Sequence, residues 1–253
     1  FGDPPVERVV DAYRDWRRSR ERTAGYLHLG DLHAPVTPPE SYVEQYDIDR
    51  SLPELGQITQ YRTDFNPDTA ACRRYREQKI QLHLAGLDYV SDQLNRLLSA
   101  VGEDTLVVVT GDHGESLWEH QERDRQMTDS RPNYCFGHGG TPFDALARVP
   151  LLTNNGDLLP TGGWGSTRDI PATVVGATVE NTDTPGHNWA TSIPKDRTVV
   201  CEGARYGAER KAIYRGEYKL IRSQTDDITL TARVTEDGER FVDRTEAVIQ
   251  QRD

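Results

Sequence analysis

Residues 104–117 read DTLVVVTGDHGESL, and this stretch decides the fold class. Residues 105–110 form an unbroken run of apolar and β-branched side chains, which is typical of a strand buried on both faces of an α/β sheet. A helical pattern over residues 69–101 leads into this run, and Gly102 ends the helix. The sequence therefore predicts a long helix followed directly by a central parallel strand. The apolar stripe of that helix consists of Ile80, Leu84, Leu87, Val90, Leu94, Leu97, Leu98 and Val101.

Shorter elements flank this core in the sequence. Asp3 is a candidate N-cap, and the prolines that follow it predict the start of an N-terminal amphipathic helix. Apolar runs at residues 26–29 and 149–152 predict two more buried strands, and residues 170–175 predict a short helix. These elements indicate an α/β domain, which we expect to cover residues 1–195.

The last part of the chain has a different pattern. Short alternating stretches are separated by hairpin-type connections, which is typical of an antiparallel sheet. We expect this sheet and a charged, frayed tail to form a small subdomain over residues 196–253. The predicted strands cover residues 198–201, 211–214, 218–222, 229–234 and 240–242.

Charge limits the classes of partner. The chain has 41 Asp and Glu against 30 Lys and Arg, which gives a formal net charge of −11. A field of this sign repels nucleic-acid backbones and anionic membranes, so we expect neither as a partner. Only four of the cations are lysines. Many carboxylates with Arg in place of Lys resemble the composition of proteins from halophilic archaea, although an ordinary acidic protein is the alternative.

Cysteine usage and hydropathy bear on the compartment. Cys72, Cys135 and Cys201 are widely spaced and odd in number, which favours free thiols in a reducing or redox-neutral compartment. No apolar run approaches the roughly 18 residues that cross a membrane. No signal peptide is visible, and a cytoplasmic location is expected, with a targeting signal upstream of Phe1 as the alternative. The chain begins at Phe1 and enters a helix at once, which we interpret as the result of a cut upstream.

Three histidines and one aspartate carry the chemistry of the sequence. Asp112 and His113 follow the strand at residues 105–110, where ligands bind in open α/β sheets. A carboxylate oxygen beside an imidazole nitrogen suits a divalent cation, although a simple turn is the alternative. His33 and His138 stand at the edges of two other predicted strands, and each could equally be a loop histidine bonded to a carbonyl. Together they suggest donors that converge on an anion beside a metal ion.

The order of these motifs resembles the sulfatase family of the alkaline-phosphatase superfamily, in an arylsulfatase-like form. The resemblance covers about residues 6–222. It rests on an ordered set of segments, namely YLHLGDLHAP at residues 26–35, DTLVVVTGDHGESL at 104–117, GHG at 137–139 with RVPLL at 148–152, RDIPAT at 168–173 and YRGEYKLI at 214–221. The resemblance implies a three-layer α/β/α sandwich with a small C-terminal antiparallel sheet.

The same resemblance implies roles for single residues. Asp112 and His113 match two ligands of the family's divalent metal, which is Ca²⁺ in most sulfatases. His33 matches the histidine that binds the sulfate oxyanion or the leaving-group oxygen. His138 stands where many sulfatases have Lys, and a histidine there is more typical of phosphoethanolamine transferases. Both histidines are thus candidate catalytic and substrate-binding residues, whereas a structural or solvated role is expected for Glu115.

The sulfatase nucleophile matures to formylglycine from a Cys or Ser in a C/S-x-P-x-R motif, and related phosphotransferases use a Thr. None of the three cysteines has Pro two residues on and Arg four residues on. We therefore interpret the chain as the C-terminal half of the protein, with formylglycine in the missing N-terminal half. The isolated fragment is expected to be inactive and prone to self-association through an exposed sheet edge.

The expected activity of the whole protein is metal-assisted hydrolysis of a small-molecule sulfate ester. Phosphoryl transfer or phosphodiester hydrolysis by the same fold is the alternative, with Zn²⁺, Mn²⁺ or Mg²⁺ as the metal. A non-catalytic binding module that keeps the fold is a third interpretation.

Overall fold

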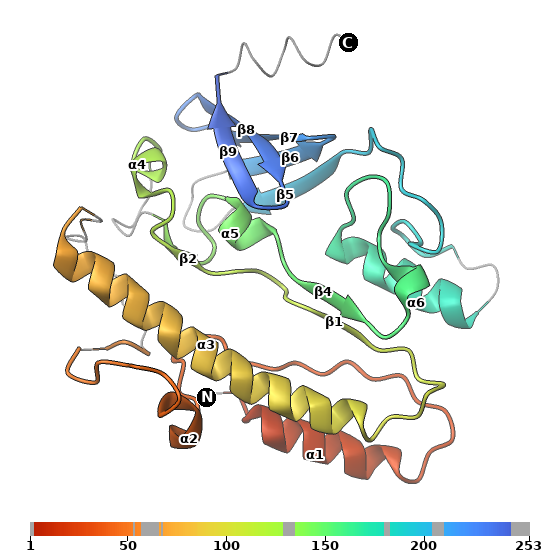
Figure 1. The fold of residues 1–253 in the computed structure, drawn as a ribbon. Helices are drawn as coiled ribbons and strands as arrows, with labels where there is room; N and C mark the ends of the chain where they lie inside the picture. Colours follow the sequence, from red (N-terminus) through yellow and green to blue (C-terminus); the bar gives the residue numbers. More distant parts are fainter. Residues whose placement is uncertain are drawn as a thin grey trace. The chain divides into compact units, whose positions relative to one another are not determined.

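The computed structural model describes residues 3–52, 54–56, 66, 68–128, 135–179, 183–203 and 210–243 (Figure 1). The chain divides into two compact units, Phe1–Thr105 and Leu106–Asp253, and each is described by itself. The first unit is helical, and the second combines short helices with antiparallel strands. Among the described residues, no helix has both the length and the apolar composition needed to cross a membrane.

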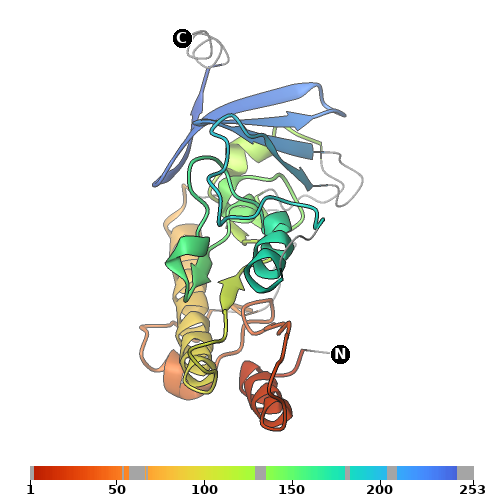
Figure 2. The ribbon, with the colours of Figure 1, turned by 90° about the vertical axis from the view of Figure 1, so that its right-hand side faces the viewer.

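The first unit is built on two helices that lie side by side, α1 (Val6–Arg17) and α3 (Ala70–Leu98), with a single helical turn α2 (Glu40–Val43) beside them (Figures 1 and 2). Their shared core consists of Val6, Val10, Tyr89, Val90 and Leu97. Both long helices were predicted from periodicity, and the structure confirms them.

The start of α1 differs from its prediction. Pro5 takes the N-cap position without a capping side chain, so the assignment of Asp3 as N-cap is wrong. Instead, the carboxylate of Asp31 accepts the backbone N–H of Val6 (Oδ2–N 2.9 Å). Burial raises the pKa of Asp31, although this bond acts in the opposite direction. A residue 25 positions away in the sequence therefore satisfies an orphan donor of the helix.

Helix α3 buries a face that is rotated from the predicted stripe. Thr69 caps it by accepting the N–H of Cys72 (3.3 Å). Leu84, Leu87 and Leu98 belong to the predicted stripe but are exposed in the structure. The buried face consists of Tyr75, Lys79, Leu82, Ala85, Gly86, Tyr89, Val90, Gln93 and Leu97. Lys79 is tolerated there because its ammonium group donates to the carbonyl oxygen of Leu55 (2.6 Å).

The predicted strand at residues 26–29 is not a strand in the structure. Tyr26 is 87% exposed, and only Leu27 and Leu29 pack against the core of α1 and α3. The segment is extended but forms no ladder with another described segment. An apolar run can therefore cover a helix pair as well as it fills the centre of a sheet.

The second unit begins with β1 (Val108–Thr110), which pairs with β4 (Leu151–Thr153) in an antiparallel register. The strand predicted at residues 105–110 thus exists in shortened form. Its ladder with β4 is antiparallel, so the predicted parallel pairing is wrong there. Strand β4 starts beside the end of β1, with Leu151 opposite Thr110, so the two strands run in opposite directions. A two-stranded ladder, β2 (Ser116–Leu117) with β3 (Phe136–Gly137), lies in the intervening segment.

The helices of the second unit are short. They are α4 (Gln121–Asp124), α5 (Asp144–Ala147), the 3₁₀ turns η1 (Gly156–Leu158) and η2 (Thr167–Asp169), and α6 (Ile170–Thr178). Helix α6 confirms the helix predicted at residues 170–175.

The C-terminal part forms the predicted antiparallel sheet (Figures 1 and 2). Its strands follow one another as a meander and are β5 (Val199–Gly203), β6 (Arg210–Arg215), β7 (Tyr218–Ser223), β8 (Ile228–Thr235) and β9 (Gly238–Val242). One face of the sheet covers a core of Met127, Cys135, Phe143, Ala212, Tyr214, Ile221, Leu230 and Val234. All five strands confirm the predicted hairpins, whereas the frayed tail lies outside the described residues.

A buried ion cluster attaches this sheet to α5. The ammonium group of Lys219 is fully buried between the carboxylates of Asp144 and Glu239, at 2.8 Å from each. The hydroxyl of Tyr214 donates to the same oxygen of Asp144 (2.8 Å). His120 contacts Glu239 (Nε2–Oε1 3.2 Å), and hydrogen bonds from His120 and Lys219 lower the pKa of Glu239 although burial raises it. Each charged group of the cluster faces a partner of opposite charge, as buried charges require.

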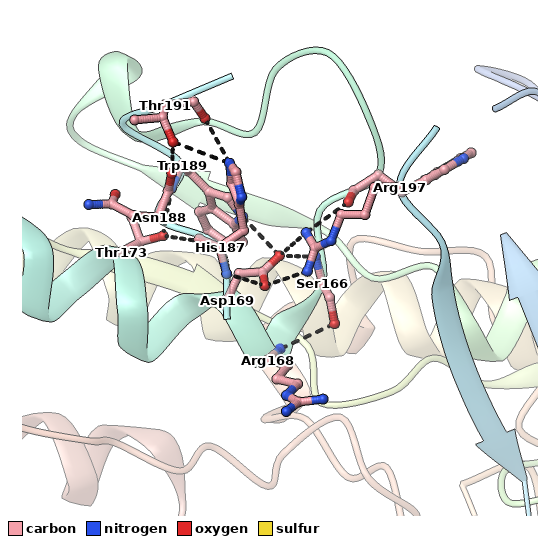
Figure 3. A network of polar contacts seen from close by, with 10 residues as sticks. Ser166, Arg168, Asp169, Thr173, His187, Asn188, Trp189, Thr191 and Arg197 are labelled. Carbon is pink, nitrogen blue, oxygen red and sulfur yellow. Dashed lines mark hydrogen bonds and ion pairs between the residues drawn. The ribbon is translucent and has the colours of Figure 1, made fainter. Parts of the chain in front are cut away.

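A second buried network surrounds Asp169 at the start of α6 (Figure 3). Its carboxylate forms a bidentate ion pair with Arg197 (Oδ2–Nη1 2.6 Å and Oδ1–Nη2 2.7 Å). It also accepts the backbone N–H groups of Ser166 and His187, both at 2.9 Å, and the indole N–H of Trp189 at 3.2 Å. Segments far apart in the sequence are thereby joined around one carboxylate.

The division at residue 195 and the three-layer sandwich stay predictions. The predicted sheet subdomain falls within the compact unit Leu106–Asp253. The structure shows an α/β chain with a C-terminal antiparallel sheet.

Candidate metal and oxyanion site

Asp112 and His113 lie in the loop that leaves β1. At the strand end, the hydroxyl of Thr110 donates to a backbone carbonyl just before β4 (2.8 Å). On the other side, Gly114 packs so closely on α5 that a Cβ there would lie 2.0 Å from the carbonyl oxygen of Ala145. Only glycine allows this approach without a shift of the backbone. The two predicted metal ligands are therefore held between two anchored positions.

The ring of His113 is fixed by its own backbone. Its Nδ1 lies 2.8 Å from the carbonyl oxygen of Gly114, and since a carbonyl only accepts, Nδ1 carries the hydrogen. The lone pair is then on Nε2, which lies 3.9 Å from Oδ2 of Asp112. The other oxygen of Asp112 accepts the backbone N–H of His113 (2.9 Å). Metal-binding histidines commonly donate their second ring nitrogen to a carbonyl in this way.

His138 is brought to the same place by the β2–β3 ladder. Ser116 pairs with Gly137, so the residues just outside the ladder, Glu115 and His138, face each other. Glu115 contacts the ring of His138 (Oε2–Nδ1 3.2 Å). The rings of His138 and His113 are stacked, with centroids 4.4 Å apart and an interplanar angle of 26°. The structure thus joins Asp112, His113 and His138, which the sequence singled out separately.

The donor chemistry fits part of a site for a divalent cation. Divalent ions bind oxygen and nitrogen donors at about 2.0–2.5 Å, so two ligands of one ion lie at most about 5 Å apart. The separation of 3.9 Å between His113 Nε2 and Asp112 Oδ2 meets this limit. Within the described ranges, no third His, Cys, Asp or Glu completes a metal-binding group. Asp112 and His113 therefore supply two donors, and their assignment as metal ligands stays a prediction.

His33 belongs to the first unit. Its backbone N–H donates to the carbonyl oxygen of Gly30 (3.0 Å), which places it in a turn after the extended segment. Its predicted role beside His138 stays a prediction.

Glu115 and His120 follow the two predicted metal ligands in the sequence and have different environments. Glu115, for which a structural or solvated role was expected, contacts His138. His120 contacts Glu239 and so belongs to the buried ion cluster under the sheet. Glu115 and His138 are 23 positions apart, and only the register of the β2–β3 ladder reveals that they meet. No sequence signal marked this pair.

The three cysteines are free thiols in the structure. Burial raises the pKa of Cys135 and of Cys201, which keeps both as protonated thiols. Cys72 lies in the first turn of α3. None of the three has the sequence context of the expected nucleophile.

The chain is 25% identical over 256 residues to an uncharacterised sulfatase, YidJ, of Escherichia coli (strain K12), with 92% of this chain and 47% of the relative covered. The chain thus spans about half the length of the curated relative it matches.

Solved structures show the same fold at low sequence identity. The yidJ protein of Bacteroides fragilis superposes with a TM-score of 0.62 at 14% identity, over 92% of this chain and 51% of its own. A phosphonate monoester hydrolase from Silicibacter pomeroyi gives 0.63 at 18% identity, over 98% and 59%. The family profile described as Sulfatase matches residues 5–164, which include Asp112, His113 and His138. The chain therefore belongs to the sulfatase family.

Proposed function

We propose that this chain provides the metal- and anion-binding part of an enzyme that hydrolyses small-molecule sulfate esters. The observation that carries the proposal is the cluster of Asp112, His113 and His138, in which a carboxylate and two stacked imidazoles meet at the end of β1. The side chain of Asp112 is 72% exposed and that of His113 is 41% exposed, so both are open to a ligand. Membership of the sulfatase family supports the reaction class.

Each residue has a definite role in this proposal. Asp112 and His113 would hold a divalent cation, Ca²⁺ in the sulfatase case, which supplies Lewis-acid stabilisation of charge on the ester oxygens. His138 would contact an ester oxygen, and His33 is proposed for a contact of the same kind. Donors fixed in advance around developing charge stabilise a transition state more than mobile ones.

The proposal takes the nucleophile from outside this sequence, because neither a Cys nor a Ser here stands in the C/S-x-P-x-R motif. A formylglycine is the expected residue, and the 253-residue chain alone is then inactive. For the complete α/β domain we propose the three-layer sandwich, which the fold similarity to the two solved structures supports.

A phosphoryl-group hydrolase or transferase is the second candidate. His138 stands in the place of the lysine of many sulfatases, and one structural relative is a phosphonate monoester hydrolase. Imidazole and ammonium groups both bind tetrahedral anions, so these residues are compatible with either ester. Zn²⁺, Mn²⁺ or Mg²⁺ would then take the place of Ca²⁺.

The decisive experiment assays the product of the full-length gene on an aryl sulfate, an aryl phosphate monoester and an aryl phosphodiester. Asp112→Asn and His113→Ala should each lower kcat/KM about 10²–10³-fold, since loss of a metal ligand removes several kcal/mol of transition-state stabilisation. Asp157→Asn, at an exposed aspartate of η1, is the matched control. Turnover of phosphate esters alone would favour the second candidate. Unchanged rates in both ligand variants would refute the assigned site.

A further inference from the structure

Glu115 and His138 meet because of strand register. In the β2–β3 ladder Ser116 is opposite Gly137, and continuing the antiparallel register by one step places Glu115 opposite His138. Gly137 and Gly139 on either side of His138 have positive φ angles of 77° and 78°, a backbone conformation that favours glycine. Both neighbours of His138 thus hold a backbone conformation that residues other than glycine rarely adopt.

The contact defines the hydrogen on the ring. A carboxylate accepts hydrogen bonds, so the 3.2 Å contact of Glu115 Oε2 with His138 Nδ1 requires Nδ1–H. In the neutral ring, Nε2 is then the nitrogen that carries the lone pair. The side chains of Glu115 and His138 are 24% and 19% exposed, so water competes only in part for the contact.

The imidazole ring of His138 is also held by stacking against one of its faces. His113 stacks on it at 4.4 Å, and the Nδ1 of His113 is bonded to the carbonyl oxygen of Gly114. Both imidazoles are therefore fixed as Nδ1–H rings by acceptors that belong to the same loop. Without such an acceptor, a neutral imidazole in water carries its hydrogen mainly on Nε2, so Glu115 selects the less common form of His138.

We propose that Glu115 is a positioning residue, whose carboxylate holds His138 in the Nδ1–H tautomer and in the orientation that directs Nε2 to the substrate oxygens. This inference rests on the proposed role of His138 in ester hydrolysis. Carboxylates that orient metal-bound imidazoles typically contribute about 10–100-fold to activity, and by analogy we expect about that loss of kcat in Glu115→Ala.

The first test is nitrogen-15 NMR of the histidine rings in the labelled 253-residue protein, at a pH where the rings are neutral. Protonated and unprotonated ring nitrogens differ widely in chemical shift, and a His138→Gln variant assigns the signals. We expect Nδ1–H in the wild type, a shift to Nε2–H in Glu115→Ala, and retention of Nδ1–H in Glu115→Gln, whose amide oxygen still accepts. The exposed Glu122→Ala is the matched control and should leave the tautomer unchanged.

A wild-type His138 with its hydrogen on Nε2 would overturn the proposal without any variant, even if Glu115→Ala failed to fold. So would a Glu115→Ala protein with unchanged ring signals. In the full-length enzyme, Glu115→Ala should lower kcat with little change in KM, and Glu115→Gln should restore part of it. If the NMR spectra show the expected tautomers but the enzyme cleaves no ester, the proposed function is refuted and the Glu115–His138 contact is still supported. If activity is present and Glu115→Ala changes nothing, the positioning role fails alone.

Discussion

Replacing Asp169 with Asn should destabilise the protein by about 3–5 kcal/mol. The carboxylate is fully buried and accepts five hydrogen bonds from described residues, two of them from the guanidinium of Arg197 (Figure 3). Oδ1 accepts from Arg197 and the backbone of His187, and Oδ2 accepts from three donors. Asn has nearly the same shape, so the substitution tests the charge and the acceptors and leaves the packing unchanged.

The magnitude follows from the two ways in which Asn can be placed. If its amide nitrogen takes the position of Oδ1, it faces two donors, and if it takes the position of Oδ2, it faces three. At least two hydrogen bonds are lost, one of them from a charged donor, which costs about 2–4.5 kcal/mol. The charge of Arg197 then has no carboxylate beside it, and the total rises to about 3–5 kcal/mol. Arg197 is 21% exposed, so water limits the cost to this range.

The loss should also depend on pH. Burial raises the pKa of Asp169, but the ion pair with Arg197 and the hydrogen bonds lower it to about 2, against 3.8 in the unfolded chain. A carboxyl group with a lowered pKa in the folded state stabilises the fold above the unfolded pKa, and this contribution disappears as pH falls through the folded pKa. The difference between the wild type and Asp169→Asn should therefore be constant above about pH 5 and shrink between pH 4 and pH 2.

Urea unfolding followed by tryptophan fluorescence measures this difference, because Trp189 is part of the network. Asp157→Asn, at an exposed aspartate, should stay within about 0.5 kcal/mol of the wild type. A loss below about 1 kcal/mol in Asp169→Asn at pH 7 would refute the assignment of this carboxylate as the centre of a stabilising network.

Three further predictions concern other buried positions. Gly114→Ala should cost about 1–3 kcal/mol in urea unfolding because its Cβ meets a backbone oxygen, whereas Gly140→Ala, with open space around it, should be neutral; equal effects would contradict the close approach. Lys219→Met removes the ammonium group that two buried carboxylates share and should cost about 3–5 kcal/mol, so a loss near zero would mean that the cluster adds no stability. Iodoacetamide should modify Cys72 before Cys135 in the native protein, since burial raises the pKa of Cys135; peptide mapping that shows the opposite order would contradict its burial.

The secondary structure was predictable where the pattern was long or local. Helix α3 and the five strands of the C-terminal sheet follow from residue spacing and hairpin turns, which act over a few residues. The sequence did not predict which other segment an apolar run packs against or pairs with. Residues 26–29 have the apolar run of a strand but cover α1 and α3, and β1 pairs antiparallel where a parallel neighbour was expected. Leu84 and Leu87 have the spacing of a buried face, yet α3 buries a face that is rotated away from them.

The sequence by itself singled out Asp112, His113 and His138 as candidate site residues, because each stands beside a glycine near a predicted strand. Only the tertiary structure decided that these three residues meet. The pairing of Ser116 with Gly137 brings Glu115 to His138, and the loop packed on α5 turns His113 onto the same ring. The physical reason is that a motif fixes the type of donor, whereas the position of a side chain 23 residues away depends on strand register and backbone packing, which no local pattern encodes.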